Sequence, residues 1–73
     1  MGKVKFNEAV RIKVLPPEIV RWRIIKKSDS LDKLGLSHAA GEFEVGNVVV
    51  TNEFGAAWCL PVERFDVLYR SRG

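Results

Sequence analysis

Cysteine and histidine are nearly absent from this sequence. Its 73 residues include one cysteine, Cys59, and one histidine, His38. A single cysteine cannot form an intrachain disulfide, which small secreted domains usually need. One residue of each kind is also too few for the four ligands of a structural zinc site. We therefore expect neither a disulfide-stabilised extracellular fold nor a metal centre, and we expect no cofactor.

Long hydrophobic runs are missing as well. The longest apolar stretches are far shorter than the roughly 20 residues that cross a bilayer, and the first residues contain no apolar core of a signal peptide. We expect a cytoplasmic protein with no membrane partner. With 47% hydrophobic and 29% charged residues the composition is that of a globular protein, and the length predicts a single domain over residues 1–73.

The residue pattern also lacks the groupings that catalysis requires. A nucleophile needs a base beside it, whereas Cys59 follows Trp58 in an apolar segment, where a free cysteine usually fills space in a core. His38 is interpreted as an ordinary loop histidine. Glu42 and Glu44 would share one face of a strand, but such pairs more often protect an exposed edge. We expect that the protein is not an enzyme.

Charge is distributed unevenly along the chain. The net charge is +3, yet residues 1–27 carry eight basic and two acidic side chains, while residues 28–73 carry four basic and seven acidic ones. A basic half attracts an acidic partner, which can be a nucleic acid or an acidic protein surface. The composition alone does not choose between them.

Hydrophobic alternation predicts strands in the first third of the chain. Residues 9–15 alternate, with apolar side chains at the even positions facing inward and Arg11 and Lys13 facing outward. Pro16 and Pro17 end this strand, because neither can donate a hydrogen bond to a ladder. Residues 19–27 are rich in β-branched residues, which favours a strand over a helix that begins at the prolines.

Further along, turn residues separate short segments. Residues 30–35 read as one helical turn, with Ser28 or Ser30 as its cap and Gly35 at its end. Residues 48–51 and 56–60 form a hairpin around the turn 52–55. A short helix over 61–69 then folds back with Phe65, Leu68 and Tyr69. The fold class predicted is α+β and β-rich, a small curled antiparallel sheet with one or two short helices.

Two segments are candidates for binding. In Arg21-Trp22-Arg23, an exposed tryptophan between arginines could stack nucleic-acid bases or form a protein hot spot; simple alternation would instead place Trp22 in the core and both arginines in solvent. Residues 1–8 are either a flexible tail or a contact segment that clasps an amphipathic peptide, with Val4 and Phe6 buried.

The stretch from Gly46 to Pro61, followed by Phe65 and Tyr69, resembles a layout found in small phage and prophage proteins, with Asn47 in place of their usual aspartate. The whole chain is similar in length and general sequence to the small phage-encoded regulators of host RNA polymerase, such as that of a lytic Xanthomonas phage. This resemblance implies binding to the N-terminus of the β′ subunit of bacterial RNA polymerase, near the RNA exit channel. It further implies inhibition of σ-dependent initiation and read-through of terminators in the cytoplasm of the infected host, with elongation factors as further candidate partners.

The basic N-terminal half is compatible with such a partner, because arginines and lysines can steer an amphipathic, partly acidic peptide to aromatic and apolar anchors. Two alternatives remain open, a small barrel that binds single-stranded nucleic acid and a phage structural or interaction module. We expect contact with nucleic acid to be secondary. The hypothesis assigns partner binding to Val4, Phe6, Arg11, Lys13, Arg21, Trp22 and Arg23.

Overall fold

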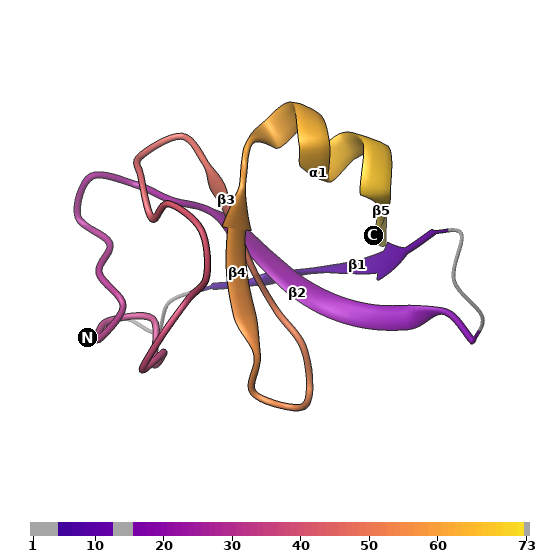
Figure 1. Cartoon of the computed structure of the whole chain (residues 1–73), viewed down its shortest axis with the longest axis horizontal. Helices are drawn as coiled ribbons and strands as arrows, with labels where there is room; N and C mark the ends of the chain where they lie inside the picture. The colour runs from indigo at the N-terminus through magenta and orange to yellow at the C-terminus, as the bar shows by residue number, and fades with distance from the viewer. Residues whose placement is uncertain (1–4, 13–15, 73) are drawn as a thin grey trace.

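A computed structural model describes residues 5–12 and 16–72, with the backbone alone for Arg72. The described chain forms β1 (Asn7–Arg11), β2 (Glu18–Ile24), β3 (Val48–Thr51), β4 (Ala57–Leu60), α1 (Val62–Leu68) and β5 (Tyr69–Arg72), shown in Figure 1. None of the described helices has the length and apolar character needed to span a membrane.

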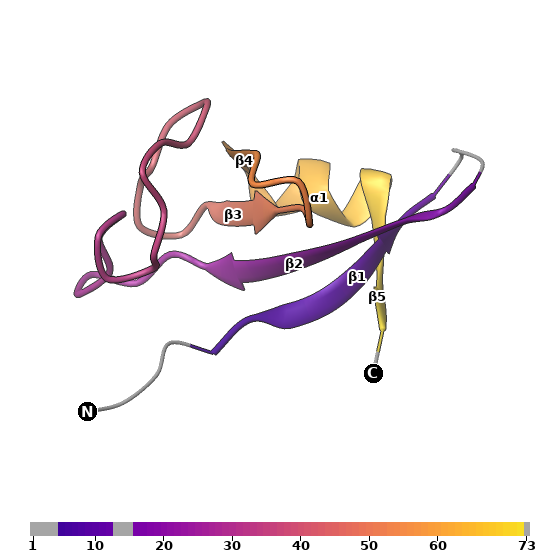
Figure 2. The same cartoon turned by 90° about the horizontal axis from the view of Figure 1, so that it is seen from below.

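The strands form one antiparallel sheet in the order β4-β3-β2-β1-β5. β1 with β2 and β3 with β4 are sequential hairpins, and β5 returns to the far side of β1. The β-rich α+β class is therefore confirmed. The sheet is open, with β4 and β5 as its two edges, so the prediction of a curled sheet is wrong. Strands β1 and β2 form the long axis of the sheet in Figure 2.

One face of the sheet, here called the helix face, is covered by α1. The helix follows Pro61 and carries the chain from β4 at one edge to β5 at the other. Its Phe65 is buried against Trp22 of β2, with ring centroids 4.9 Å apart, and against Tyr69 of β5, at 5.0 Å. Trp58 donates a hydrogen bond from Nε1 to the Tyr69 hydroxyl at 3.2 Å. These aromatic contacts join both edges of the sheet to the helix.

The opposite face of the sheet is covered only in part, by the segment between β2 and β3. Ile25, Leu34 and Val49 form a second buried cluster there, with Phe6 among the side chains packed against it. Ala40 fixes this segment to the edge of β4, because its N–H donates to the Ala57 carbonyl and its carbonyl accepts from the Cys59 N–H. The next residue, Gly41, has φ +82°, and a Cβ there would lie 2.6 Å from the Cys59 carbonyl oxygen. Only glycine allows this close approach.

Most predicted elements are present. The hairpin of β3 and β4 is confirmed, as is the short helix, which begins at Val62 rather than Pro61. The helical turn at residues 30–35 is confirmed by the hydrogen bond from the Lys33 N–H to the Ser30 hydroxyl and by the left-handed Gly35. Residues 19–27 do contain a strand, β2, and no helix.

Two predictions are corrected at the ends of the chain. In β1 the fully buried side chain is Ala9, and Val10 faces the other side, so the predicted inward face of residues 9–15 is wrong. The shift follows from pairing, because Ala9 lies opposite the buried Val20 in the register of β1 and β2. Tyr69 is not helical but begins β5, where its backbone is extended (φ −130°, ψ 153°).

Candidate functional site

The seven residues predicted to bind a partner do not form one continuous surface. Val4 and Lys13 lie outside the described residues. Phe6 is half-buried and packs against the second cluster, so it belongs to the fold rather than to a free tail. Asn7 and Glu8 are likewise part of β1, so the described part of the predicted tail, residues 5–8, is joined to the sheet.

Arg11 lies on the helix face, at the end of β1. It is paired in register with Tyr69 of β5, and its guanidinium carbon lies 5.9 Å from the centre of the Tyr69 ring. A cation over an aromatic face at this distance is attracted by the ring quadrupole. Arg11 is half-buried in this position, and it is on the opposite side of the sheet from Arg21.

Period-two alternation separates the three residues of the Arg21-Trp22-Arg23 run. Trp22 points to the helix face, where it packs on Phe65, while Arg21 and Arg23 point to the opposite face. Arg21 is exposed, and Trp22 and Arg23 are half-buried. A tryptophan stacked between two exposed arginines is therefore not formed. The interpretation that places Trp22 in the core is the one that the structure supports.

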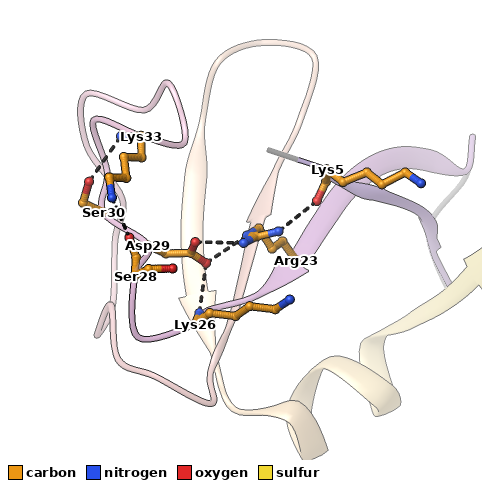
Figure 3. A network of polar contacts seen from close by, with 7 residues as sticks. All are labelled: Lys5, Arg23, Lys26, Ser28, Asp29, Ser30 and Lys33. Atoms are coloured by element: carbon orange, nitrogen blue, oxygen red, sulfur yellow. Dashed lines mark hydrogen bonds and ion pairs between the residues drawn. The ribbon is translucent and has the colours of Figure 1, made fainter. Parts of the chain in front are cut away.

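Arg23 is held in a polar network at the end of β2, drawn in Figure 3. Its Nε and Nη2 each donate to a carboxylate oxygen of Asp29 at 2.8 Å, and its Nη1 donates to the Lys5 carbonyl at 3.3 Å. The Arg23 and Asp29 side chains are 16% and 5% exposed. The bidentate hydrogen bond from Arg23 lowers the pKa of Asp29, and the same bond raises the pKa of Arg23.

Asp29 also organises the turn that follows β2. One of its carboxylate oxygens accepts a hydrogen bond from the Lys26 backbone N–H at 2.9 Å, while its own N–H donates to the Lys26 carbonyl at 2.9 Å. In Figure 3 the side chains of Lys5 and Lys26 extend away from Asp29 in a common direction. The network thus fixes two backbone segments from which lysine side chains extend into solvent.

A groove lies directly beside this network and is lined by Lys5, Asn7, Trp22, Arg23, Ile24 and Lys26. We call it the basic groove. Its lining contains three cationic residues and no carboxylate, and Asp29 neutralises only the Arg23 charge. Lys5 and Lys26 make no ion pair with another described residue. The charge of these two lysines is therefore available to an acidic ligand.

Ile24 supplies an exposed apolar surface in the basic groove. It is the last residue of β2, and the side chain is 44% exposed. The next residue, Ile25, turns into the second cluster, where its N–H donates to the Asn47 carbonyl at 2.8 Å. Alternation thus places Ile25 on the same face as Arg23 and leaves Ile24 exposed on the helix face, at the end of the strand. Trp22 also lines this groove, and its buried indole Nε1 has no hydrogen-bond partner among the described residues.

The basic groove suits a short segment that combines carboxylates with an apolar side chain. Lysines supply long-range attraction and set orientation, while burial of apolar surface at Ile24 and Trp22 contributes affinity. Two of the seven predicted residues, Trp22 and Arg23, line this groove. Sequence reasoning missed Ile24 and Lys26, although the lysine pair 26–27 directly after a strand was a visible signal.

The described histidine, cysteine and carboxylate side chains considered as metal ligands or catalytic groups do not form a cluster. Among residues 5–12 and 16–72, no three histidine, cysteine, aspartate or glutamate side chains gather as a metal site would require. Cys59 is half-buried in β4, and burial raises the pKa of its thiol. A raised pKa lowers the thiolate fraction, which is the opposite of what activates a nucleophilic cysteine.

Comparison with known proteins adds no family to this description. The chain matches no protein-family model, no curated protein and no solved structure.

Proposed function

We propose that this protein is a phage-type regulator that binds bacterial RNA polymerase through its basic groove. The ligand in this proposal is an acidic, amphipathic segment in the N-terminal region of the β′ subunit, near the RNA exit channel. Binding there inhibits σ-dependent initiation and promotes terminator read-through in the cytoplasm of the infected host. The groove itself, with free lysines around an exposed isoleucine, is the observation that carries the proposal.

Two fixed lysines beside an exposed isoleucine favour a protein segment with a few acidic side chains as the ligand. Lys5 and Lys26 are fixed through their backbones by the Arg23–Asp29 network, so little backbone entropy is lost when they meet carboxylates. Ile24 lines the same groove and offers an apolar contact that a phosphate backbone would not use. The identity of the partner is taken from the resemblance to small phage regulators of RNA polymerase that the sequence suggests.

Single-stranded nucleic acid is less well supported as the main ligand. Such binding relies on aromatic side chains on which bases stack. Trp22 is half-buried against Phe65, and Arg21 lies on the other face of the sheet. Contact with nucleic acid therefore stays secondary in this proposal.

The test is retention of bacterial core RNA polymerase by the purified protein after nuclease treatment. The variant K5E/K26E reverses both free charges of the basic groove, and we expect it to weaken binding about tenfold. The variant R64E/R70E changes the net charge equally at exposed positions outside this groove, so it should bind like the wild type. Promoter and terminator assays with the same variants then connect binding to transcription.

The outcomes separate the proposals cleanly. If wild-type protein fails to retain polymerase yet binds oligonucleotides with a steep dependence on salt, the polymerase proposal is abandoned. If both double variants weaken binding to the same extent, net charge rather than the basic groove is responsible.

A further inference from the structure

Phe54 is the most exposed large hydrophobic side chain of the described chain, at 82%. All seven aromatic residues are described, and the other six are buried or half-buried. Phe54 sits in the turn between β3 and β4, which projects past β2 at the lower edge of Figure 1. It packs in neither hydrophobic cluster, so the fold does not need an aromatic side chain at this position.

The turn that presents Phe54 is closed by its own hydrogen bonds. The Asn52 side-chain oxygen accepts from the N–H groups of Phe54 and Ala56, each at 3.0 Å, and the Asn52 N–H donates to the Ala56 carbonyl at 3.1 Å. Gly55 takes the left-handed conformation that the turn requires, with φ +89°. A held backbone reduces the conformational entropy lost on binding, as an anchor side chain in an interface requires.

A second groove begins at the residue next to Phe54. We call it the acidic groove, and it includes Glu8, Glu18, Ile19, Arg21, Thr51 and Glu53. Ile19 is 48% exposed and gives the groove an apolar contact. Three of the six residues are carboxylates and one is an arginine, and none of the four makes an ion pair with another described residue. The groove therefore carries a net negative charge.

We propose that Phe54 and the acidic groove form a second docking surface, which binds a basic, partly apolar segment of a partner protein. Phe54 enters an apolar pocket of the partner, while lysine or arginine side chains of the segment meet Glu18 and Glu53. Ile19 covers an apolar residue of the same segment. This surface does not depend on RNA polymerase and prefers the opposite charge from the basic groove.

The negative charge of the acidic groove favours a basic protein segment over a membrane, a nucleic acid or a second copy of the chain. An anionic membrane or a nucleic acid would be repelled by three carboxylates around the groove. A second copy of this chain could offer its basic groove to Phe54, and that arrangement would join copies head to tail. Self-association is therefore one of the outcomes that the test has to separate.

The test is an NMR titration of the full-length ¹⁵N-labelled protein with two short capped peptides, one alternating lysine with leucine and one alternating glutamate with leucine. We expect the basic peptide to shift amide signals of Ile19, Thr51 and Phe54. The acidic peptide should instead shift those of Ile24 and Lys26, so this arm tests the basic groove separately.

Variants of two exposed hydrophobic residues identify the anchor. F54S should lower affinity for the basic peptide about tenfold, whereas V67S, at another exposed position on α1, should leave it unchanged. E53K should weaken the basic peptide and spare the acidic one.

Three results would overturn the proposal. The first is a basic peptide that shifts no signal in the acidic groove, and the second is an F54S variant that binds this peptide like the wild type. The third is concentration-dependent self-association in sedimentation that F54S abolishes, because it would assign the surface to a second copy of the chain.

Discussion

The two ends of β2 have opposite electrostatic character. At its C-terminal end Ile24 lies beside Lys5 and Lys26, and at its N-terminal end Ile19 lies beside Glu18 and Glu53. Each end thus combines one exposed isoleucine with charges of predominantly one sign. Since affinity at such sites comes from apolar contact and selectivity from charge, the two ends should select ligands of opposite sign.

This contrast could not be seen in the linear distribution of charge. Both Glu8 and Glu18 belong to the basic first part of the chain, yet the β1–β2 hairpin and the β3–β4 turn bring them together with Glu53. Arg21 joins this acidic set instead of the basic one. Charge segregation in the folded chain follows strand pairing, and the basic half of the sequence is not a basic half of the molecule.

The interactions that stabilise the two ends of β2 also differ. The basic end depends on an ion pair between side chains, Arg23 and Asp29, whereas the acidic end depends on neutral hydrogen bonds around Asn52. Both ends share one support, the aromatic packing of α1 on the helix face. Substitutions at Phe65, Asp29 and Phe54 separate these dependencies.

The largest effect is expected from F65A, which removes the shared support. Phe65 is buried between Trp22 and Tyr69, and truncation of a buried phenylalanine costs about 3–5 kcal/mol of unfolding free energy. A chain of this size has little more than that to lose. Thermal denaturation followed by circular dichroism should show an unfolded variant at room temperature, and both peptides should cease to bind. V67A, on the exposed side of the same helix, should change stability by less than about 0.5 kcal/mol.

An intermediate effect is expected from D29N, which acts at the basic end alone. Loss of the charged acceptor leaves Arg23 poorly paired and should cost about 1–3 kcal/mol of unfolding free energy. Urea denaturation would measure this cost. D29N frees the Arg23 charge, but it also removes the network that holds the backbones of Lys5 and Lys26, and we expect this loss to dominate. Binding of the acidic peptide should therefore weaken, while binding of the basic peptide by the folded variant should not change. An equal loss at both grooves would show that the two ends are not independent.

The pH dependence of the unfolding free energy is a second test of the role given to Asp29. The pKa of Asp29 lies below its ordinary value of 3.8, so the ionised carboxylate stabilises the fold above that value. This contribution is lost as the pH falls through the lowered pKa. The stability difference between the wild type and D29N should be constant above about pH 5 and shrink in more acidic solution. A difference that grows on acidification would contradict the role given to Asp29.

Local signals explain which parts of the fold were predictable. The β3–β4 hairpin has an apolar run, a turn around Gly55 and a second apolar run, and it was predicted within one residue. β5 was missed, because Tyr69 continues a helical spacing and the three residues after it are polar. Its extended conformation is set by pairing with β1, a contact that no local pattern reports.

The candidate site was predictable only in part for a related reason. Alternation correctly separates Trp22 from Arg21 and Arg23, but the sequence does not show that Asp29 neutralises one of these arginines. Alternation puts Ile24 and Ile25 on opposite faces, but the sequence does not show that the segment before β3 covers Ile25 while Ile24 stays exposed. Exposed isoleucines therefore became visible as groove residues only in the folded chain.

The smallest effect concerns Cys59. The reactivity of its thiol should depend on whether the segment between β2 and β3 stays in place over the face of the sheet opposite α1. Burial raises its pKa above the ordinary 9.0, and its backbone N–H is bonded to the Ala40 carbonyl at 2.7 Å. At pH 8 iodoacetamide should therefore modify it more slowly than a cysteine in an unstructured peptide. D29N should raise this rate, because the covering segment begins at the network that Asp29 holds, whereas F54S at the acidic end should leave it unchanged. Mass spectrometry of timed samples measures all three rates, and an increase in F54S would show that the turn at Phe54 and the covering segment open together.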